Sequence, residues 1–307
     1  WEVPALAILN ELRYRAAMRG MTRFELDVLY ARAKAKLWGK VERLLALRDE
    51  GSLRIADFGT RRRHGFLWQR WCVEAMQEGL GKSFIGTSNV KHAMETGLEA
   101  IGTNAHELPM VYAAIAAAKG SDEDVRESQY DVLQNWQHIY GTHLRVFLPD
   151  TFGTTQFLKN APSWIQWWKG SRPDSKDPIE AGEEMIEFWR HMGADPRNKI
   201  CLFSDGLDIQ IDGHEPNGTD MVAIHDAMGG RISDTYGWGT MATNDFLDCP
   251  PGRPTALKPL SLVCKVQSVN GRPAVKLSDN PAKATSPSKD EIERYKKIFG
   301  VEGVGEG

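Results

Sequence analysis

Apolar residues recur at helical spacing in the first fifty residues. The first predicted helix begins near Pro4, a residue that suits the first turn of a helix. It carries leucines at positions 6, 9 and 12. A second, longer helix begins at Thr22, which forms the pattern of a capping box with Glu25, and Gly51 stands where a helix stops. We expect both helices to be scaffold.

From residue 53 onward, short runs typical of strands alternate with helical stretches. The strand-like runs are Arg54–Phe58, Ser83–Ile85, Glu99–Ile101, Leu144–Leu148, Trp164–Trp168, Lys199–Phe203 and Arg231–Tyr236. Helical patterns between them include Leu67–Gly79, Asp124–Tyr140 and Pro178–Met192. Repeated βα units predict a parallel sheet with right-handed crossovers. Seven such units over about 190 residues favour a closed or nearly closed barrel over an open sheet.

The last part of the chain has a different pattern. Two strand-like runs, Leu260–Val269 and Ala274–Leu277, flank Asn270-Gly271, which is a strong signal for a β-hairpin. Lys289–Phe299 has the pattern of a terminal helix. Because a hairpin cannot continue a parallel barrel, we assign this part to a separate lobe.

The predicted fold is therefore α/β: a TIM-like barrel with a second, smaller α+β lobe. Residues 1–52 would be a helical lead-in, the remainder of a truncated N-terminal lobe, because the helical pattern begins so abruptly that we expect an upstream part of the natural protein to be missing. Residues 53–250 would form the barrel and hold the active site. Residues 251–307 would return as a hairpin and helix to the smaller lobe.

Composition narrows the classes of function. The net charge is −3, so a nucleic-acid-binding surface is not expected. The run from Arg61 to Arg63 is short and suits one anionic small molecule better than a duplex. The four cysteines are far apart, which argues against a disulfide framework and a zinc site. No apolar stretch approaches the roughly 20 residues of a membrane span, and no signal peptide is visible, so we expect a cytoplasmic protein.

Polar and glycine residues follow all seven predicted strands, at the end where barrel enzymes place their active sites. Glycines with free backbone amides can surround phosphate oxygens. The residues expected to bind phosphate are Gly206, Gly237, Gly239 and Thr240. Asp174 and Asp205 can accept hydrogen bonds from sugar hydroxyls. Arg61 and Arg172 can form paired contacts with a carboxylate or a phosphate.

Each of these features also has an ordinary structural explanation. A Gly-x-Gly turn is often only a turn, and an aspartate after a strand often caps a helix. A lone histidine such as His106 is often structural, and three arginines can be a solvated surface run. Because such groups follow every predicted strand, the pattern favours a site for a small ligand with a phosphate, a sugar and another anionic group.

Several blocks in these positions resemble motifs of nicotinate phosphoribosyltransferases. The longest are Asp57–Arg63, Gly86–Val90, Gly102–Glu107 and Phe203–Asp208. Shorter ones are Arg172–Ser175, Gly237–Thr240, Asn244–Phe246 and Lys276–Asp279. The similarity runs in order from residue 1 to about residue 285.

This resemblance implies a type II phosphoribosyltransferase, whose second lobe is made from both chain ends. Family members are homodimers with active sites shared at the subunit interface. They make nicotinate mononucleotide and pyrophosphate from nicotinate and 5-phosphoribosyl 1-pyrophosphate, in the salvage pathway of NAD biosynthesis. ATP is a co-substrate, and its hydrolysis is coupled to turnover through a phosphohistidine. The histidine in the matching block is His106, and Mg²⁺ is expected to neutralise the pyrophosphate.

The sequence departs from the family pattern in three ways. Lys176 replaces a usual glycine, which would add a charge beside the ribose site. Trp238 is bulkier than the usual residue between its two glycines. The family's upstream region, whose aromatic residues help to clamp the pyridine ring in the neighbouring subunit, is absent. Its absence puts the activity of the chain by itself in doubt.

Three other functions are considered. Nicotinamide phosphoribosyltransferases have an aspartate where this chain has Ser88, and a carboxylate there would repel nicotinate. Ser88 can instead donate a hydrogen bond to it, so we expect Ser88, with Arg61 or Arg172, to bind nicotinate. The second alternative is a non-catalytic nucleotide-binding relative, against which an intact His106 argues. A phosphate-binding barrel isomerase is a distant third.

Overall fold

The computed structural model describes residues 2–51, 53–212, 216, 218–252 and 257–301. The chain forms two compact units. The first unit comprises residues 1–102, 206–229 and 234–264. The second unit comprises residues 103–205, 230–233 and 265–307.

The helical start of the first unit follows the prediction. Its helices are α1 (Glu2–Met18), α2 (Arg23–Arg43) and α3 (Leu45–Asp49). The predicted capping box is confirmed: the Glu25 N–H donates to Thr22 Oγ1 at 3.3 Å, and Glu25 Oε2 accepts from the Thr22 N–H at 2.7 Å. The second helix is shorter than predicted, because it ends at Arg43 and the short α3 follows it.

The first unit contains a parallel sheet with the strand order β3-β2-β1-β9. Its strands are β1 (Ile55–Asp57), β2 (Phe84–Thr87), β3 (Glu99–Ala100) and β9 (Ser233–Trp238). The first residue of β9, Ser233, belongs to the second unit, and the rest of β9 belongs to the first. A separate parallel pair consists of β7 (Leu207–Asp208) and β8 (Thr219–Asp220). The remaining helices are α4 (Phe66–Leu80), α5 (Val90–Thr96), α10 (Met221–Met228) and α11 (Thr240–Thr243), with the 3₁₀ turns η1 (Thr60–Arg62) and η2 (Gly81–Ser83). The strands carry their polar residues at the carboxyl ends, as predicted.

The second unit contains three parallel strands in the order β4-β5-β6. They are β4 (Val146–Phe147), β5 (Gly170–Ser171) and β6 (Ile200–Phe203). Its helices are α6 (Glu107–Lys119), α7 (Asp122–Tyr140), α8 (Thr154–Lys159), α9 (Pro178–His191) and α12 (Lys289–Phe299). Short 3₁₀ turns are η3 (Ser163–Trp167), η4 (Pro196–Asn198) and η5 (Pro281–Lys283). Side-chain caps define the starts of several helices; Asp177, for example, accepts from the N–H groups of Ile179 and Glu180 at 2.9 and 3.1 Å.

One predicted strand is wrong. Residues 164–167 are not extended: they belong to the 3₁₀ turn η3, and the Trp168 N–H donates to Ile165 O at 2.8 Å at its end. The strand comes just afterwards, at Gly170–Ser171. A Cβ at Gly170 would lie 2.1 Å from Ile200 O of the neighbouring strand β6, so only glycine allows this close approach. The aromatic run therefore did not predict the backbone conformation; Trp168 is buried, whereas Trp167 is exposed.

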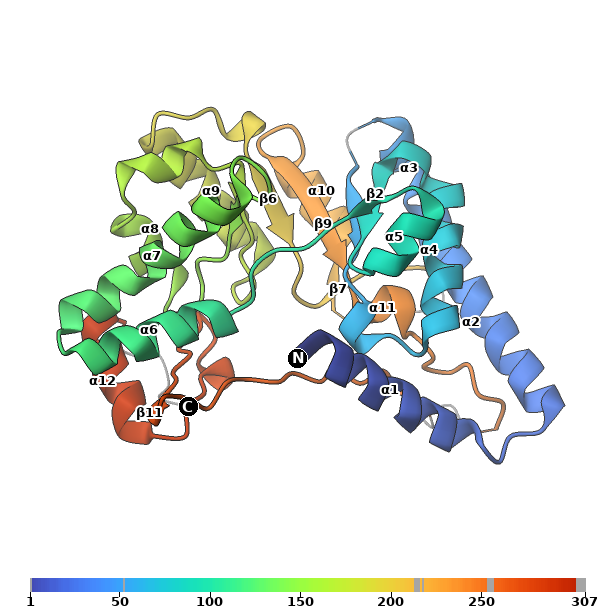
Figure 1. Cartoon of the computed structure of the whole chain (residues 1–307). Helices are drawn as coiled ribbons and strands as arrows, with labels where there is room; N and C mark the ends of the chain where they lie inside the picture. The colour runs from blue at the N-terminus through green and yellow to red at the C-terminus, as the bar shows by residue number, and fades with distance from the viewer. Residues whose placement is uncertain (1, 52, 213–215, 217, 253–256, 302–307) are drawn as a thin grey trace. The chain divides into compact units, whose positions relative to one another are not determined.

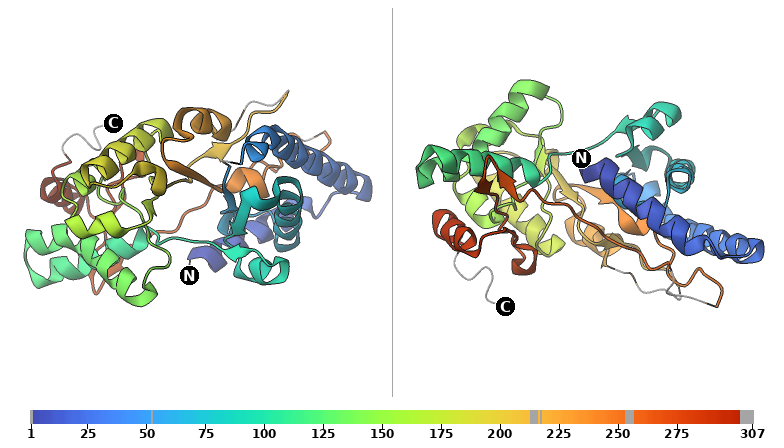
Figure 2. Two further views of the ribbon diagram at one scale, coloured as in Figure 1. Left: turned by 90° about the horizontal axis from the view of Figure 1, so that it is seen from above. Right: turned by 60° about the horizontal axis from the view of Figure 1, so that its bottom comes forward.

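The predicted hairpin forms around Asn270-Gly271 but is shorter than predicted: most of Leu260–Val269 is not in a strand, and Ala274–Leu277 lies beyond the second strand. The predicted terminal helix is confirmed. The hairpin pairs β10 (Ser268–Val269) with β11 (Arg272–Pro273), and α12 has the predicted bounds. Figure 1 and Figure 2 show α12, in red, beside the green helices α6 and α7. Phe152 stacks on Phe299 at 4.4 Å between ring centroids, within an apolar cluster shared by these helices. The C-terminal part thus completes the core of the second unit.

The α/β class and the parallel strands are confirmed. A closed barrel, a second lobe and the predicted domain boundaries stay predictions. Of the helices in the described part of the chain, none has the length and apolar composition that crossing a lipid bilayer requires.

A buried histidine in the first unit predicts acid sensitivity. The His64 ring is 3% exposed and stacks on Phe246 with 3.8 Å between ring centroids. Burial lowers the pKa of His64 to about 3. Because this pKa lies below the unfolded value of about 6.5, the unfolded state binds more protons, and stability is lost as the pH falls below about 6.5.

We expect the titration of His64 to lower the free energy of unfolding by about 2 kcal/mol when the pH falls from 7 to 5. A His64→Phe variant should lose that part of the pH dependence, because phenylalanine keeps the stacking ring and binds no proton. Urea unfolding of both proteins at the two pH values measures the difference. Equal losses in the two proteins would show that His64 is not the group that titrates.

Candidate functional site

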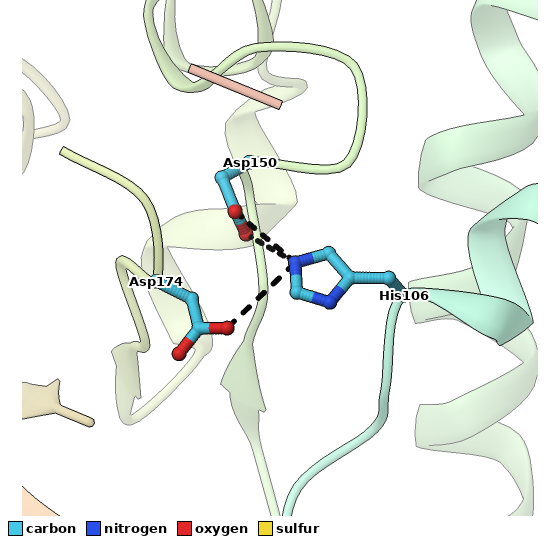
Figure 3. Close-up of side chains that lie close together, drawn as sticks. All are labelled: His106, Asp150 and Asp174. Carbon is cyan, nitrogen blue, oxygen red and sulfur yellow. Dashed lines mark hydrogen bonds and ion pairs between the residues drawn. The ribbon is translucent and has the colours of Figure 1, made fainter. Parts of the chain in front are cut away.

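In the second unit, His106 lies at the start of α6 and faces two carboxylates. Its ring is almost fully buried, and its Nε2 lies 2.9 and 3.1 Å from the two oxygens of Asp150. Asp174 Oδ2 lies 4.0 Å from the same nitrogen. Figure 3 shows the imidazole reaching from α6 toward both carboxylates, with its other ring nitrogen, Nδ1, on the opposite side. Nε2 thus faces the two carboxylates, and Nδ1 points away from them.

Asp150, directly beyond β4, is held as a carboxylate. It is fully buried and accepts a hydrogen bond from Ser175 Oγ at 2.7 Å, with Lys276 Nζ at 3.9 Å. Burial alone would raise the pKa of Asp150, but His106, Lys276 and Ser175 hold it well below its usual range. An ionised Asp150 accepts the Nε2 proton of His106, which leaves the lone pair of a neutral imidazole on Nδ1.

Asp174 is stabilised in its charged form by the neighbouring Arg172. It accepts a hydrogen bond from Ser204 Oγ at 2.6 Å. Burial raises the pKa of Asp174, and Arg172, His106 and Ser204 together lower it below its ordinary value. Arg172 donates through Nη2 to Asn104 O at 3.3 Å, while its Nε is buried without a partner among the described residues. An unpartnered guanidinium nitrogen can still bind an anionic ligand.

The predicted ribose residue Asp205 lies in the same unit and pairs with Lys283. Lys283 Nζ also lies 3.5 Å from Asp174 O, so it links the two predicted ribose residues. The structure thus brings His106, Arg172 and Asp174 together, and connects Asp205 to them through a lysine.

Three functional candidates in this group had no predicted role. Asp150, Ser175 and Lys276 all stand in segments that follow predicted strands or match family blocks, so their position was a signal. The contacts of Ser175 and Lys276 with Asp150 could not be predicted, because they join residues far apart in the sequence. Asp279 completes the set: its carboxylate accepts from the Thr154 N–H at 2.7 Å, and its own N–H donates to Ser175 Oγ at 3.2 Å.

The other predicted site residues lie in the first unit. Ser88 follows β2, and its Oγ lies 2.8 Å from Thr60 Oγ1. Arg61, in η1, forms an ion pair with Glu2. The guanidinium of Arg61 therefore already has a carboxylate partner. The Ser88 hydroxyl is bonded to neutral groups, the N–H and the hydroxyl of Thr60.

The three predicted phosphate-binding glycines have different local reasons for lacking a side chain. Gly206 has a φ of +59°, and its carbonyl accepts from the Thr219 N–H at 2.7 Å. A Cβ at Gly237 would lie 2.7 Å from the Phe58 ring, so packing alone excludes a side chain there. A Cβ at Gly239 would make only ordinary contact, 3.5 Å from Phe58 O. Packing therefore does not explain Gly239.

Thr240 and a buried lysine lie next to these glycines. Thr240 Oγ1 is buried without a partner among the described residues. Lys40 Nζ lies 2.6 Å from Asp208, 2.7 Å from Asp245 and 3.2 Å from Met241 O. Lys40 thus ties the segment after Gly206 to the segment after Gly239, and holds both predicted phosphate-binding segments in place.

The model of the nicotinate phosphoribosyltransferase (NAPRTase) family matches residues 53–303. The chain belongs to this family. A nicotinate phosphoribosyltransferase from Porphyromonas gingivalis is 27% identical, with a TM-score of 0.76, and the match covers 98% of this chain and 70% of that one. One from Vibrio cholerae is 29% identical, with a TM-score of 0.82 and coverages of 97% and 66%.

The chain thus spans about two thirds of the length of these nicotinate phosphoribosyltransferases. Its departures from the family pattern are accommodated locally. Lys176 Nζ pairs with Glu184 at 2.7 Å and bonds Thr155 Oγ1 at 2.8 Å, so its extra charge is neutralised. Trp238 is fully buried, with Lys40 Nζ 5.8 Å from its ring centroid.

Among the described residues, His106, Asp150 and Asp174 form a group whose ligand atoms lie within 4.8 Å of one another and could hold a metal ion. Mg²⁺ prefers oxygen ligands in octahedral geometry, and this group offers one nitrogen and two carboxylates. Lys276 already supplies a positive charge beside Asp150. The group therefore fits a histidine held by two carboxylates better than a Mg²⁺ site.

Proposed function

We propose that this protein is a nicotinate phosphoribosyltransferase that joins nicotinate to 5-phosphoribosyl 1-pyrophosphate and couples the reaction to ATP hydrolysis. The observation that carries the proposal is the buried His106–Asp150 pair in a chain of this family. A cytoplasmic homodimer with shared active sites, acting in NAD salvage, is part of the same proposal.

Displacement of pyrophosphate builds positive charge on the ribose and negative charge on the leaving group. Such a reaction needs positioning and electrostatic stabilisation more than covalent chemistry. We assign the ribose hydroxyls to Asp174 and Asp205. The 5′-phosphate is assigned to Gly206, Gly237, Gly239 and Thr240. Mg²⁺ bound with the substrate would neutralise charge on the pyrophosphate.

His106 supplies the coupling to ATP. Its Nδ1 lone pair would attack the γ-phosphorus; a nitrogen–phosphorus bond forms, the bond to the bridging oxygen breaks, and ADP leaves with the electron pair. Asp150 holds the Nε2 proton and balances the positive charge that develops on the ring. The cation Arg172 is suited to stabilise the added phosphoryl group, whereas Lys276 lies beside Asp150, on the Nε2 side of the ring.

Nicotinate carries a carboxylate on its ring, and the chain offers two kinds of group for it. Ser88 can donate a hydrogen bond, and Arg61 or Arg172 can supply a positive charge. Arg61 would have to share its guanidinium with Glu2, whereas the Nε of Arg172 has no partner among the described residues. Arg61 belongs to the first unit and Arg172 to the second. Both arginines are candidates for binding the nicotinate carboxylate.

Gly239 tests the phosphate assignment. A Gly239→Val variant should bind nicotinate mononucleotide at least about tenfold more weakly, because a side chain keeps the 5′-phosphate from the backbone amides. The Cβ of the introduced valine meets only an ordinary contact, 3.5 Å from Phe58 O. Titration calorimetry with nicotinate mononucleotide measures the dissociation constant.

The matched control is Gly20→Val, at a glycine where a Cβ has nothing within 4 Å and where no site is proposed. It should leave the affinity unchanged. Normal affinity in the Gly239→Val protein would show that the 5′-phosphate lies elsewhere.

A further inference from the structure

A continuous chain of hydrogen bonds, buried at Asp57 and partly buried at Ser88, joins these two residues in the first unit. Gln69, on α4, is fully buried, and its Nε2 lies 2.7 Å from Asp57 Oδ2 and 2.9 Å from Thr60 Oγ1. Thr60 Oγ1 in turn lies 2.8 Å from Ser88 Oγ. The proposed nicotinate residue Ser88 is therefore the outer end of a network whose inner end is a carboxylate.

The amide of Gln69 can be placed in only one orientation. Its Oε1 faces Arg63 Nη1 at 3.2 Å and Asn89 Nδ2 at 3.0 Å. A guanidinium can only donate, and Asn89 presents its NH₂ because its own oxygen accepts from the His92 N–H at 3.3 Å. The NH₂ of Gln69 must then face Asp57 and Thr60. A flipped amide would place an NH₂ against a guanidinium and an oxygen against a carboxylate.

Asp57 receives hydrogen bonds and gives none. The Gly59 N–H donates to it at 2.7 Å, and Thr87 Oγ1 lies at 2.6 Å. The Thr87 oxygen accepts from the Asn89 N–H at 3.1 Å, which leaves its proton for Asp57. Burial raises the pKa of Asp57, while the bonds from Thr87, Gly59 and Gln69 oppose that rise. The direction of donation thus runs toward Asp57 at this end of the network.

The direction of donation is also defined at the Thr60–Ser88 end of the network. The Thr60 oxygen accepts an N–H from Gln69, and among the described residues Ser88 is the acceptor left for the Thr60 proton. The Ser88 oxygen also accepts from the Thr60 N–H at 3.4 Å. Its own proton is therefore free to point outward.

We infer that Gln69 and Thr60 are positioning residues that make Ser88 an outward-facing hydrogen-bond donor, and so select a carboxylate over an amide on the pyridine ring. This inference rests on the proposed function. A carboxylate only accepts, and a hydrogen bond to it is about twice as strong as one between neutral groups. An amide gains less from a donor, because its NH₂ group needs an acceptor. If Ser88 donated to Thr60 instead, it would present a lone pair that repels nicotinate.

Gln69→Glu reverses the network with almost no change of shape. The introduced carboxyl group and Asp57 would share one proton, since two adjacent buried carboxylates cannot both ionise. The introduced oxygen that faces Thr60 would accept the Thr60 proton, so Ser88 would have to donate to Thr60. We expect the ratio of kcat/KM for nicotinate to that for nicotinamide to fall at least about tenfold.

A second substitution separates this effect from structural damage. In Gln69→Glu/Thr60→Val, Ser88 has no hydroxyl to which it can donate and again points its proton outward. The double variant should return to the ratio of Thr60→Val alone, to within about twofold. Gln77→Glu, on the same helix, is the control for an added carboxylate, and its ratio should equal that of the wild type.

These assays use the full-length protein, with both substrates. A folded Gln69→Glu enzyme with an unchanged ratio would overturn the inference, and so would a double variant as impaired as the single one. Should Gln69→Glu not fold, Gln69→Leu takes its place: without the Gln69 N–H the Thr60–Ser88 bond can reverse, so the ratio again falls and Thr60→Val again restores it. A wild-type protein that uses neither substrate would overturn the proposed function as well, whereas a selective wild type with unaffected variants overturns the network alone.

Discussion

Replacing His106 with alanine in the full-length protein is expected to abolish acid-labile labelling from γ-labelled ATP. The imidazole is the proposed nucleophile, and nothing else in the His106–Asp150–Asp174 group can form a phosphoramidate. Because the carboxylate of Asp150 holds Nε2, the reactive nitrogen would be Nδ1. Loss of the ring should therefore remove the label completely, not merely reduce it.

The measurement is the acid-labile, alkali-stable phosphate on the protein after brief incubation with ATP. The matched control is His191→Ala, at an exposed histidine at the end of α9, which should keep full labelling. Undiminished labelling of the His106→Ala protein would rule out His106 as the phosphorylated residue.

Ser88→Asp is expected to harm nicotinate use more than Ser88→Ala. Alanine only removes a hydrogen bond to a charged group, worth roughly 1.5–3 kcal/mol, or roughly tenfold to hundredfold in affinity. Aspartate adds a negative charge opposite the substrate carboxylate, and it can accept from the amide of nicotinamide. We therefore expect a larger loss for nicotinate and some gain for nicotinamide.

The test is kcat/KM for both substrates in the two variants of the full-length protein. If Ser88→Asp leaves the value for nicotinate unchanged, Ser88 does not face the pyridine carboxylate. The discrimination would then lie at Arg61 or Arg172.

The helices could be predicted from the sequence because their signals are local. Ser288 caps α12 by accepting from the Glu291 N–H at 3.2 Å, and α12 has the predicted bounds. Pro178 and Asp177 likewise mark the start of α9. A cap acts within three residues, so one sequence is enough to reveal it.

Strands were harder, because their conformation depends on distant neighbours. The run from Trp164 to Trp168 has aromatic residues suited to a strand, yet it forms a turn, and the strand falls on Gly170. Gly170 is in the sheet because Ile200 of β6 approaches it closely. No local propensity contains that contact.

In the candidate site, too, local features could be predicted from the sequence and contacts between distant residues could not. The positions of His106 and Asp174 after strands were visible in the sequence, and their family blocks gave them roles. The partners were not visible: Asp150 lies 44 residues beyond His106, and Arg61 pairs with Glu2, 59 residues before it. The role of Gln69 was also hidden, because a glutamine inside a helix has no sequence signal until its partners are known.

The formation of nicotinate mononucleotide by the full-length protein tests the proposed reaction most directly. Nicotinate, 5-phosphoribosyl 1-pyrophosphate, Mg²⁺ and ATP are supplied together, and the products are identified by mass spectrometry, with nicotinamide in a parallel reaction. We predict that nicotinate mononucleotide accumulates together with ADP, faster with ATP than without it, and that nicotinamide is a poor substrate. No mononucleotide above the protein-free control, or nicotinamide mononucleotide as the main product, would contradict the proposed function.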